Sequence, residues 1–295
     1  MIRPVKFAYN AETAVNNSFQ TASNDDKVQQ KALEEFDSFV EKLRAKGVDV
    51  TVVQDTAEPY TPDSIFPNNW ISFHEGGTVF LYPMFAVNRR LERKQTVMDA
   101  IDQKFTINKT IDFSTREQDH IFLEGTGSMV LDRDNKIAYA CISPRTDKHL
   151  LEEFCAAANY TAMAFTANDQ NGDAIYHTNV MMCVADKYVV ICLESITDIT
   201  ERKEVITAIE KTGKEIIDIT LLQMNQFAGN MLQVMNKEQQ PFLVMSTQAY
   251  ESLTAAQVSA IEKYNPILHS NIKTIETNGG GSARCMMAEV FLDPK

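Results

Sequence analysis

The sequence predicts an α/β fold in which five ββαβ units form a pseudo-fivefold, five-bladed propeller. Five apolar, strand-like stretches each follow a small polar residue, and these marker residues are Asn69, Ser128, Asn179, Asn230 and Ser282. The markers lie 59, 51, 51 and 52 positions apart, so the chain repeats at a nearly constant period. Closure into a ring protects the sheet edges that an open sheet exposes, which favours the propeller over an open α/β sheet with irregular loops.

Each of the first four units begins with a predicted β-hairpin. A polar turn separates the first strand from a second apolar strand, as expected for a hairpin bounded by turn residues. The turns span residues 74–77, 132–135, 185–187 and 236–240, and the second strands span 78–84, 136–143, 188–194 and 241–246.

A helix and a third strand complete each unit. Apolar residues at three- and four-residue spacing predict helices over 89–104, 147–159, 198–211 and 254–264. Short strand-like segments follow at 106–113, 161–167, 215–220 and 272–277. The two ends of the chain together form the fifth unit, with strands at 5–9 and 48–54, a helix from about Asn24 to Lys46 and a lone final strand at 282–292.

The composition is that of an acidic globular protein without an evident domain boundary. Of 295 residues 44% are hydrophobic, and 28 Lys and Arg against 40 Asp and Glu give a formal net charge of -12. This charge argues against nucleic acid or an anionic membrane as a partner, because phosphate binding needs a basic face. No apolar run approaches the ~20 residues of a membrane span, and the N-terminus turns polar too early for a secretory signal. We therefore expect one catalytic domain over residues 1–295, located in the cytoplasm.

Equivalent positions of a ring converge on its axis, so the residues around the repeat markers are the candidate site. A cysteine, a histidine and a glutamate occur there, namely Cys285, His177 and Glu124. This set is typical of a cysteine nucleophile with a base and an orienting carboxylate. Because a free thiol has a pKa of about 8.5, we expect an adjacent imidazolium or a cationic substrate to favour the thiolate. The glycine run at 279–281 lets the backbone approach the reacting centre closely.

The other cysteines predict no additional chemistry. Cys141, Cys155, Cys183 and Cys192 lie in apolar stretches, where a free cysteine is usually a small buried hydrophobe. The five cysteines show no CxxC spacing and the histidines form no HExxH pair, so we expect no metal site and no disulfide framework. A reducing compartment fits this pattern.

Four motifs resemble, in the right order, those of the guanidine-modifying superfamily. They are PDSIFPNN at 62–69, LEGTG at 123–127, HTN at 177–179 and GGGSARC at 279–285. The superfamily includes arginine deiminases, dimethylarginine hydrolases and amidinotransferases. The resemblance implies a five-bladed α/β propeller, a small guanidino or ureido substrate and no organic cofactor.

The resemblance also implies a catalytic triad and its reaction. Cys285 corresponds to the nucleophile, His177 to the general acid and base, and Glu124 to the carboxylate that completes the triad. The sulfur attacks the central carbon of a guanidino or ureido group and an amine leaves. Water or a second amine then resolves the covalent intermediate.

Four further residues resemble substrate-binding positions. Asp63 corresponds to an acid that binds the substrate head group, and Arg145 to an arginine that binds the substrate carboxylate. Arg89 and Arg90 resemble a second arginine-bearing segment near the pocket. Which arginine anchors the far end of the substrate stays open.

Neutral residues replace acids near the expected head-group pocket. Asn68 and Asn69 stand where dimethylarginine hydrolases carry Glu-Asp, Asn179 stands where deiminases carry Asp, and Ser128 also replaces an acid. A charge pair about 4 Å apart is worth roughly 4 kcal/mol at an effective dielectric constant of about 20, so binding of a guanidinium is weakened. An Asn amide both donates and accepts hydrogen bonds, which suits a neutral ureido group. We therefore expect a citrulline-like substrate, held in part by Asn69 and Asn179, with an arginine-like substrate as the alternative.

Two other functions share the same features. An amidino- or carbamoyltransferase differs only in the group that resolves the intermediate. A non-catalytic binding protein of the same ring fold, as among ribosome anti-association factors, would lack the triad. The polar loops 10–23 and 54–69 are either lids over the site or plain surface loops, and a homo-oligomer is left open.

Overall fold

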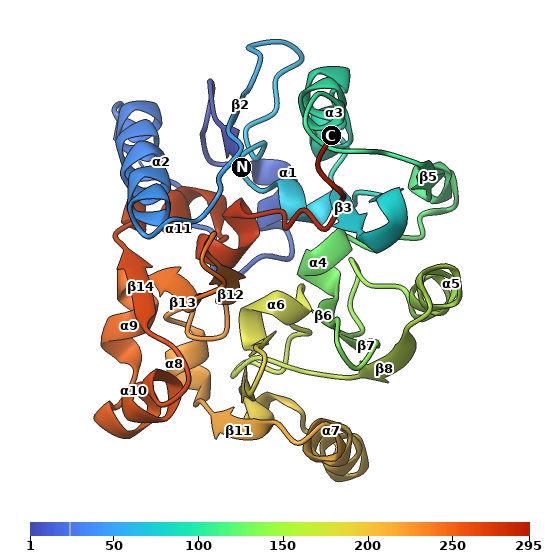
Figure 1. The fold of residues 1–295 in the computed structure, drawn as a ribbon, viewed down its shortest axis with the longest axis vertical. Helices are drawn as coiled ribbons and strands as arrows, with labels where there is room; N and C mark the ends of the chain where they lie inside the picture. Colours follow the sequence, from blue (N-terminus) through green and yellow to red (C-terminus); the bar gives the residue numbers. More distant parts are fainter. Residues whose placement is uncertain (24) are drawn as a thin grey trace.

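The computed structural model describes residues 1–23 and 25–295 and has the mixed α/β fold that the sequence predicts. Its strands form five small sheets that follow one another in chain order around a common centre (Figure 1). Four sheets have three strands and one has two. As far as the described residues show, no sheet closes on itself, so the closed five-bladed propeller stays a prediction.

The four three-stranded sheets share one topology. In each sheet an antiparallel hairpin is joined by a third strand that runs parallel to its second strand. Such a parallel pair requires a crossover connection, which is helical in each of these sheets. The sheets consist of β3 (Ile71–His74), β4 (Thr78–Leu81) and β5 (Lys109–Asp112); β6 (Val130–Asp132), β7 (Ile137–Cys141) and β8 (Thr161–Phe165); β9 (Met182–Val184), β10 (Tyr188–Ile191) and β11 (Glu215–Asp218); and β12 (Leu232–Met235), β13 (Pro241–Ser246) and β14 (Ile267–Ser270). The two-stranded sheet pairs β1 (Ile2–Arg3) with β2 (Val53–Gln54) in parallel.

The crossover helices lie at the periphery (Figure 1). They are α3 (Gln95–Asp102), α5 (Lys148–Ala158), α7 (Ile199–Lys211), α9 (Thr247–Ser252) and α10 (Ala255–Glu262), while α2 (Val28–Ala45) connects β1 to β2. Asp147, Asp198 and Thr254 each accept a hydrogen bond from a backbone N–H of the first turn, which fixes the start of α5, α7 and α10. Shorter helices occupy several connections, namely α1 (Ala11–Ala14), η2 (Glu75–Gly77), η3 (Asn88–Glu92), η4 (Ser114–Asp119), η5 (Leu193–Ser195) and α8 (Leu221–Met224).

Two strands predicted near the C-terminus are wrong. Residues 272–277 lie almost entirely in helix α11 (Lys273–Gly279), and the third strand of this unit is β14. Ile272 and Ile275 are both buried three positions apart, a spacing that fits a helix better than a strand. The predicted strand at 282–292 is instead the 3₁₀ helix η6 (Ala283–Met286) followed by an irregular tail.

The N-terminal unit is also less regular than predicted. No strand forms at 5–9, because the pairing partner of β2 is β1, which lies nearer the start of the chain. The expected strand at 48–54 is reduced to β2. Helix α2 begins at Val28, and Asn24, the expected helix start, lies outside the described residues.

Four of the five repeat markers, Asn69, Ser128, Asn179 and Ser282, lie on or beside one-turn helices at the centre of the fold. These are η1 (Pro67–Asn69), α4 (Gly125–Ser128), α6 (Thr178–Met181) and η6, and η1 contacts α4 and η6 while α4 contacts α6. Gly125 has φ +47, and a Cβ there would lie 2.4 Å from the Asn68 carbonyl oxygen. Only glycine therefore allows α4 and η1 to approach this closely. The convergence of these four markers follows from these contacts.

Within the described residues, no helix has both the length and the apolar character needed to cross a bilayer.

Candidate active site

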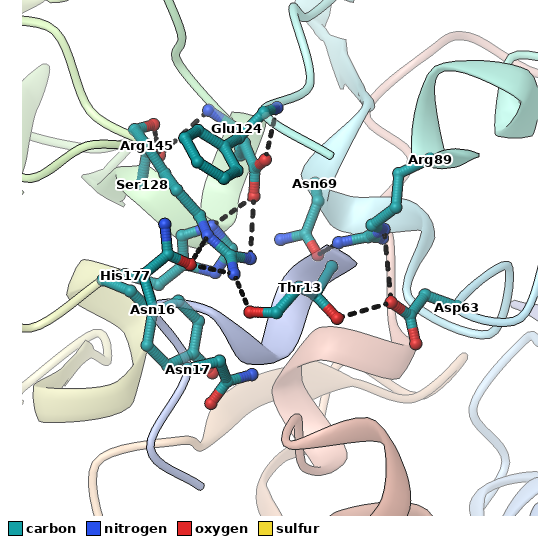
Figure 2. A network of polar contacts seen from close by, with 12 residues as sticks. Thr13, Asn16, Asn17, Asp63, Asn69, Arg89, Glu124, Ser128, Arg145 and His177 are labelled. Atoms are coloured by element: carbon teal, nitrogen blue, oxygen red, sulfur yellow. Dashed lines mark hydrogen bonds and ion pairs between the residues drawn. The ribbon is translucent and has the colours of Figure 1, made fainter. Parts of the chain in front are cut away.

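Glu124 and His177 form a buried pair beside Arg145 (Figure 2). Glu124 Oε2 lies 2.7 Å from His177 Nε2 and 3.5 Å from Arg145 Nη1, and Oε1 accepts the backbone N–H of Phe85 at 2.9 Å. An ionised carboxylate only accepts hydrogen bonds, so His177 Nε2 carries the proton and Nδ1 keeps its lone pair.

Burial and charge set the protonation states of this pair. Burial acts to raise the pKa of Glu124, but the Arg145 charge and the His177 hydrogen bond outweigh it and hold this pKa at about 2. Burial lowers the pKa of His177 to about 4, although Glu124 acts in the opposite direction. At neutral pH the pair is therefore a carboxylate and a neutral imidazole, so the resting imidazole does not supply the positive charge expected beside the thiol.

We expect this pair to make the protein less stable as pH falls from about 6.5 to about 4. The pKa of His177 is about 4 when folded and about 6.5 when unfolded, so the unfolded chain takes up the proton first. At about 1.4 kcal/mol per pKa unit, the free energy of unfolding falls by an amount on the order of 3 kcal/mol across this range. Urea unfolding at a series of pH values measures it. A His177→Gln variant should show a shallower decline, and an equally steep decline would contradict the assignment.

Cys285 lies in η6 and is 3% exposed, at the wall of a small cavity. Two side-chain amides face its sulfur: Asn179 Nδ2 at 3.4 Å and Asn230 Nδ2 at 3.3 Å. His177 lines the same cavity, whereas Glu124 lies behind the imidazole. The structure thus brings the predicted nucleophile and base to one cavity and places the carboxylate on the far side of the base.

Arg89 also lines the cavity, and its guanidinium holds neighbouring side chains in place. Its guanidinium donates two hydrogen bonds to Glu92, at 2.8 and 2.9 Å, and one to Asn69 Oδ1 at 2.9 Å. Although burial acts to lower the pKa of Arg89, the contacts with Glu92 and Asp63 raise it, so the group stays charged. Because arginine only donates, the Asn69 amide is fixed with Nδ2 pointing away from Arg89, toward His177 (Figure 2).

Three buried polar atoms around the cavity have no hydrogen-bond partner among the described residues: the donor Asn69 Nδ2 and the acceptors Asp63 Oδ1 and Asn179 Oδ1. The other oxygen of Asp63 accepts from Asn10 at 2.7 Å and from Thr13 at 3.2 Å. Since buried polar groups are normally paired, these atoms are suited to a polar ligand.

The two remaining arginines differ in position. Arg145 lines the cavity, but its guanidinium is bonded to the Thr13 carbonyl at 2.7 Å, to the Asn16 side chain and to Glu124. Arg90 donates to the Met84 and Phe85 carbonyls and is not brought to the cavity.

The N-terminal segment contacts the site through residues that were not among the predicted site residues. Asn10, Thr13, Asn16 and Asn17 reach Asp63, Arg145 and the Gly280 carbonyl from the loop at 10–23. The Asn- and Thr-rich composition of this loop was the available signal. Asn230 also contacts the site without being one of the predicted site residues, and its place at the fourth repeat marker could have indicated it.

A sequence profile for the family described as N,N dimethylarginine dimethylhydrolase, eukaryotic, matches residues 3–292. The chain belongs to this dimethylarginine dimethylhydrolase family. The match confirms the predicted membership in the guanidine-modifying superfamily, and the family is one of hydrolases that act on C–N bonds other than peptide bonds. No curated protein sequence matches the chain significantly.

Several solved structures have a similar fold. Apo ArgZ, an arginine dihydrolase from the ornithine-ammonia cycle in cyanobacteria, superposes with a TM-score of 0.77 at 16% identity over 100% of this chain and 40% of ArgZ. The substrate-bound N-terminal domain of ArgZ gives a TM-score of 0.74 at 17% identity over 99% of this chain and 98% of that domain. A dimethylarginine dimethylaminohydrolase bearing an S-methyl-L-thiocitrulline adduct gives 0.66 at 12% identity over 97% and 96% of the two chains. This chain therefore spans less than half of full-length ArgZ.

Among the described residues, no cluster of three or more His, Cys, Asp and Glu side chains is placed to hold a metal ion.

Proposed function

We propose that this protein hydrolyses the C–N bond of a ureido amino acid such as citrulline through a covalent intermediate on Cys285. The observation that carries the proposal is the buried donor Asn69 Nδ2, which has no hydrogen-bond partner in the part of the chain that the structure describes and which Arg89 fixes toward the cavity. A ureido group has a carbonyl oxygen that accepts this hydrogen bond. A guanidinium has no acceptor, so it would leave the buried donor unpaired, at a cost of about 1–3 kcal/mol.

Charge around the cavity supports the same choice. Arg89 is a buried cation within 4.0 Å of Asp63, so the acid expected to bind the head group already has a positive neighbour. Burial raises the pKa of Asp63, and Arg89 and the Asn10 and Thr13 hydrogen bonds only partly oppose that rise. A neutral head group avoids repulsion by Arg89, whereas the amino groups of a ureido head can still donate to Asp63 Oδ1 and Asn179 Oδ1.

The triad residues then have defined roles. Nδ1 of His177 takes the proton of the Cys285 thiol, the resulting thiolate attacks the ureido carbon and a C–S bond forms. The C–N bond then breaks as the leaving amine takes this proton from Nδ1. Water loses a proton to His177 and attacks the thiocarbamate, which releases the sulfur. When ammonia is the first leaving group, the products are ammonia and a carbamate that decomposes to ornithine and carbon dioxide. Glu124 keeps the proton of His177 on Nε2, so that Nδ1 is the nitrogen left to exchange protons with the reacting groups.

The N-terminal segment fits the role of a lid. Residues 10–20 bind Asp63, Arg145 and the Gly280 carbonyl, so they cover the cavity and occupy the guanidinium expected to anchor the substrate carboxylate. Asn16 and the Thr13 carbonyl would leave Arg145 when a substrate carboxylate takes their place. We further infer a closed five-bladed ring that forms one catalytic domain over 1–295 and acts in the cytoplasm on a small molecule, without nucleic acid or membrane as partner.

Citrulline should be turned over with release of ammonia and ornithine, and arginine should be turned over at least about tenfold less efficiently, since losing one buried hydrogen bond costs about 1.4 kcal/mol or more. Parallel assays of both substrates, methylated arginines and added acceptor amines measure this. An Asn69→Asp variant removes the donor and adds a charge, so it should shift preference toward arginine. Efficient arginine turnover with none on citrulline would overturn the ureido proposal, and a carbamoylated acceptor amine would indicate a transferase.

A further inference from the structure

Asn230 lies against the sulfur of the proposed nucleophile. It lies in the segment that connects α8 to β12, and its side chain is fully buried. Nδ2 is 3.3 Å from Cys285 Sγ. The preceding residue explains this position, because a Cβ on Gly229 would lie 2.3 Å from the Val180 carbonyl oxygen. Only glycine lets this loop pack directly on α6 and bring Asn230 to the sulfur.

Two backbone groups fix the orientation of the Asn230 amide. Oδ1 accepts the backbone N–H of Arg284 at 3.0 Å, and Nδ2 donates to the carbonyl of Asn179 at 2.9 Å. Exchanging the nitrogen and oxygen would set donor against donor and acceptor against acceptor. The second hydrogen of Nδ2 is therefore available to the sulfur, while Oδ1, 3.7 Å from Sγ, can accept the proton of the neutral thiol.

The charged and titratable groups around Cys285 do not supply the stabilisation that a thiolate needs. They are His177, Tyr176, Asp63, Arg89, Arg145 and Arg284. His177 is neutral at pH 7, and the arginines are bonded elsewhere: Arg89 to Glu92, Arg145 to Glu124, and Arg284 to the Met287 carbonyl and Glu289. The ureido head group of the substrate brings no charge either. Hydrogen bonds from fixed amides are thus the direct stabilisation available to a thiolate at this position.

We propose that Asn230 is a catalytic residue that stabilises the Cys285 thiolate through the Nδ2 hydrogen bond, with Asn179 as the second donor. The inference rests on Cys285 being the nucleophile, as proposed above. It predicts that Asn230 determines how much of the thiol is ionised at neutral pH, before any substrate binds.

The test is the rate of iodoacetamide alkylation at Cys285 as a function of pH, without substrate, read by peptide mass spectrometry. In Asn230→Ala the pH of half-maximal reactivity should rise by about one unit, a tenfold loss of thiolate at neutral pH. Asn230→Asp should shift it further, because this variant keeps the size and the acceptor for the Arg284 N–H but sets a carboxylate oxygen against the sulfur. Gln226→Ala, at an exposed position of the same loop, is the matched control and should show no shift.

Unchanged pH profiles in both Asn230 variants, with only a lower melting temperature, would overturn the proposal and leave Asn230 a structural residue. The assay also separates this inference from the function proposed above. A shifted profile in a protein that does not turn over citrulline would retain the thiolate role and reject the substrate. Citrulline turnover with an unshifted profile would reject the thiolate role alone.

Discussion

Replacing Cys285 with alanine is expected to reduce citrulline turnover by about 10⁴-fold or more. Removing a covalent nucleophile eliminates the intermediate itself, and variants of this kind in other enzymes keep only the catalysis due to binding and orientation. Initial rates of ornithine formation, measured with enough enzyme to quantify slow turnover, give the loss. The fold should persist, because the substitution removes a single sulfur atom from a position that is 3% exposed.

Cys155→Ala is the matched control for this loss. Cys155 is also buried, 4% exposed, but lies on α5 in a separate apolar cluster away from the cavity. Its variant should keep most of the activity. Comparable rates for Cys285→Ala and the wild type would exclude Cys285 as nucleophile.

Glu124→Gln should lower kcat for citrulline by about 10²–10⁴-fold with a smaller effect on KM. The glutamine keeps the shape, but its amide can donate toward His177 and so favour the tautomer with the proton on Nδ1, where the reaction needs a lone pair. The variant also removes the charge that faces Arg145. Steady-state kinetics with citrulline measure both parameters.

Glu117→Gln provides a comparison for charge loss alone. Glu117 pairs with Arg93 at 2.7 Å and does not line the cavity, so its variant should lose stability before it loses kcat. A loss of less than tenfold in kcat for Glu124→Gln would show that the imidazole does not depend on this carboxylate.

The repeated hairpins and crossover helices could be predicted from the sequence because each has a strong local signal. Alternating apolar runs, polar turns and Asp or Thr caps mark β3 to β13 and α5, α7 and α10. Errors occurred where apolar spacing was short and ambiguous, as in α11 and η6. There the tertiary environment decides, since Ile275 and Met286 are fully buried in a helical rather than an extended backbone.

The sequence predicted which residues make up the candidate site better than it predicted their charge states and hydrogen bonds. The repeat placed Cys285, His177 and Asn179 near one centre. Sequence could not show that burial keeps His177 neutral, because that depends on desolvation and on Glu124 and Arg145 together. Nor could it show that Arg89 turns the Asn69 donor toward the cavity, because this is a contact between η1 and η3.

The covalent intermediate on Cys285 is tested most directly by quenching the protein with acid during turnover of citrulline labelled at the ureido carbon and mapping the label by peptide mass spectrometry. The label should be found on Cys285 as a thiocarbamate in the wild type and should be absent from Cys285→Ala. Turnover without label on Cys285, or label on another residue, would exclude Cys285 as the nucleophile.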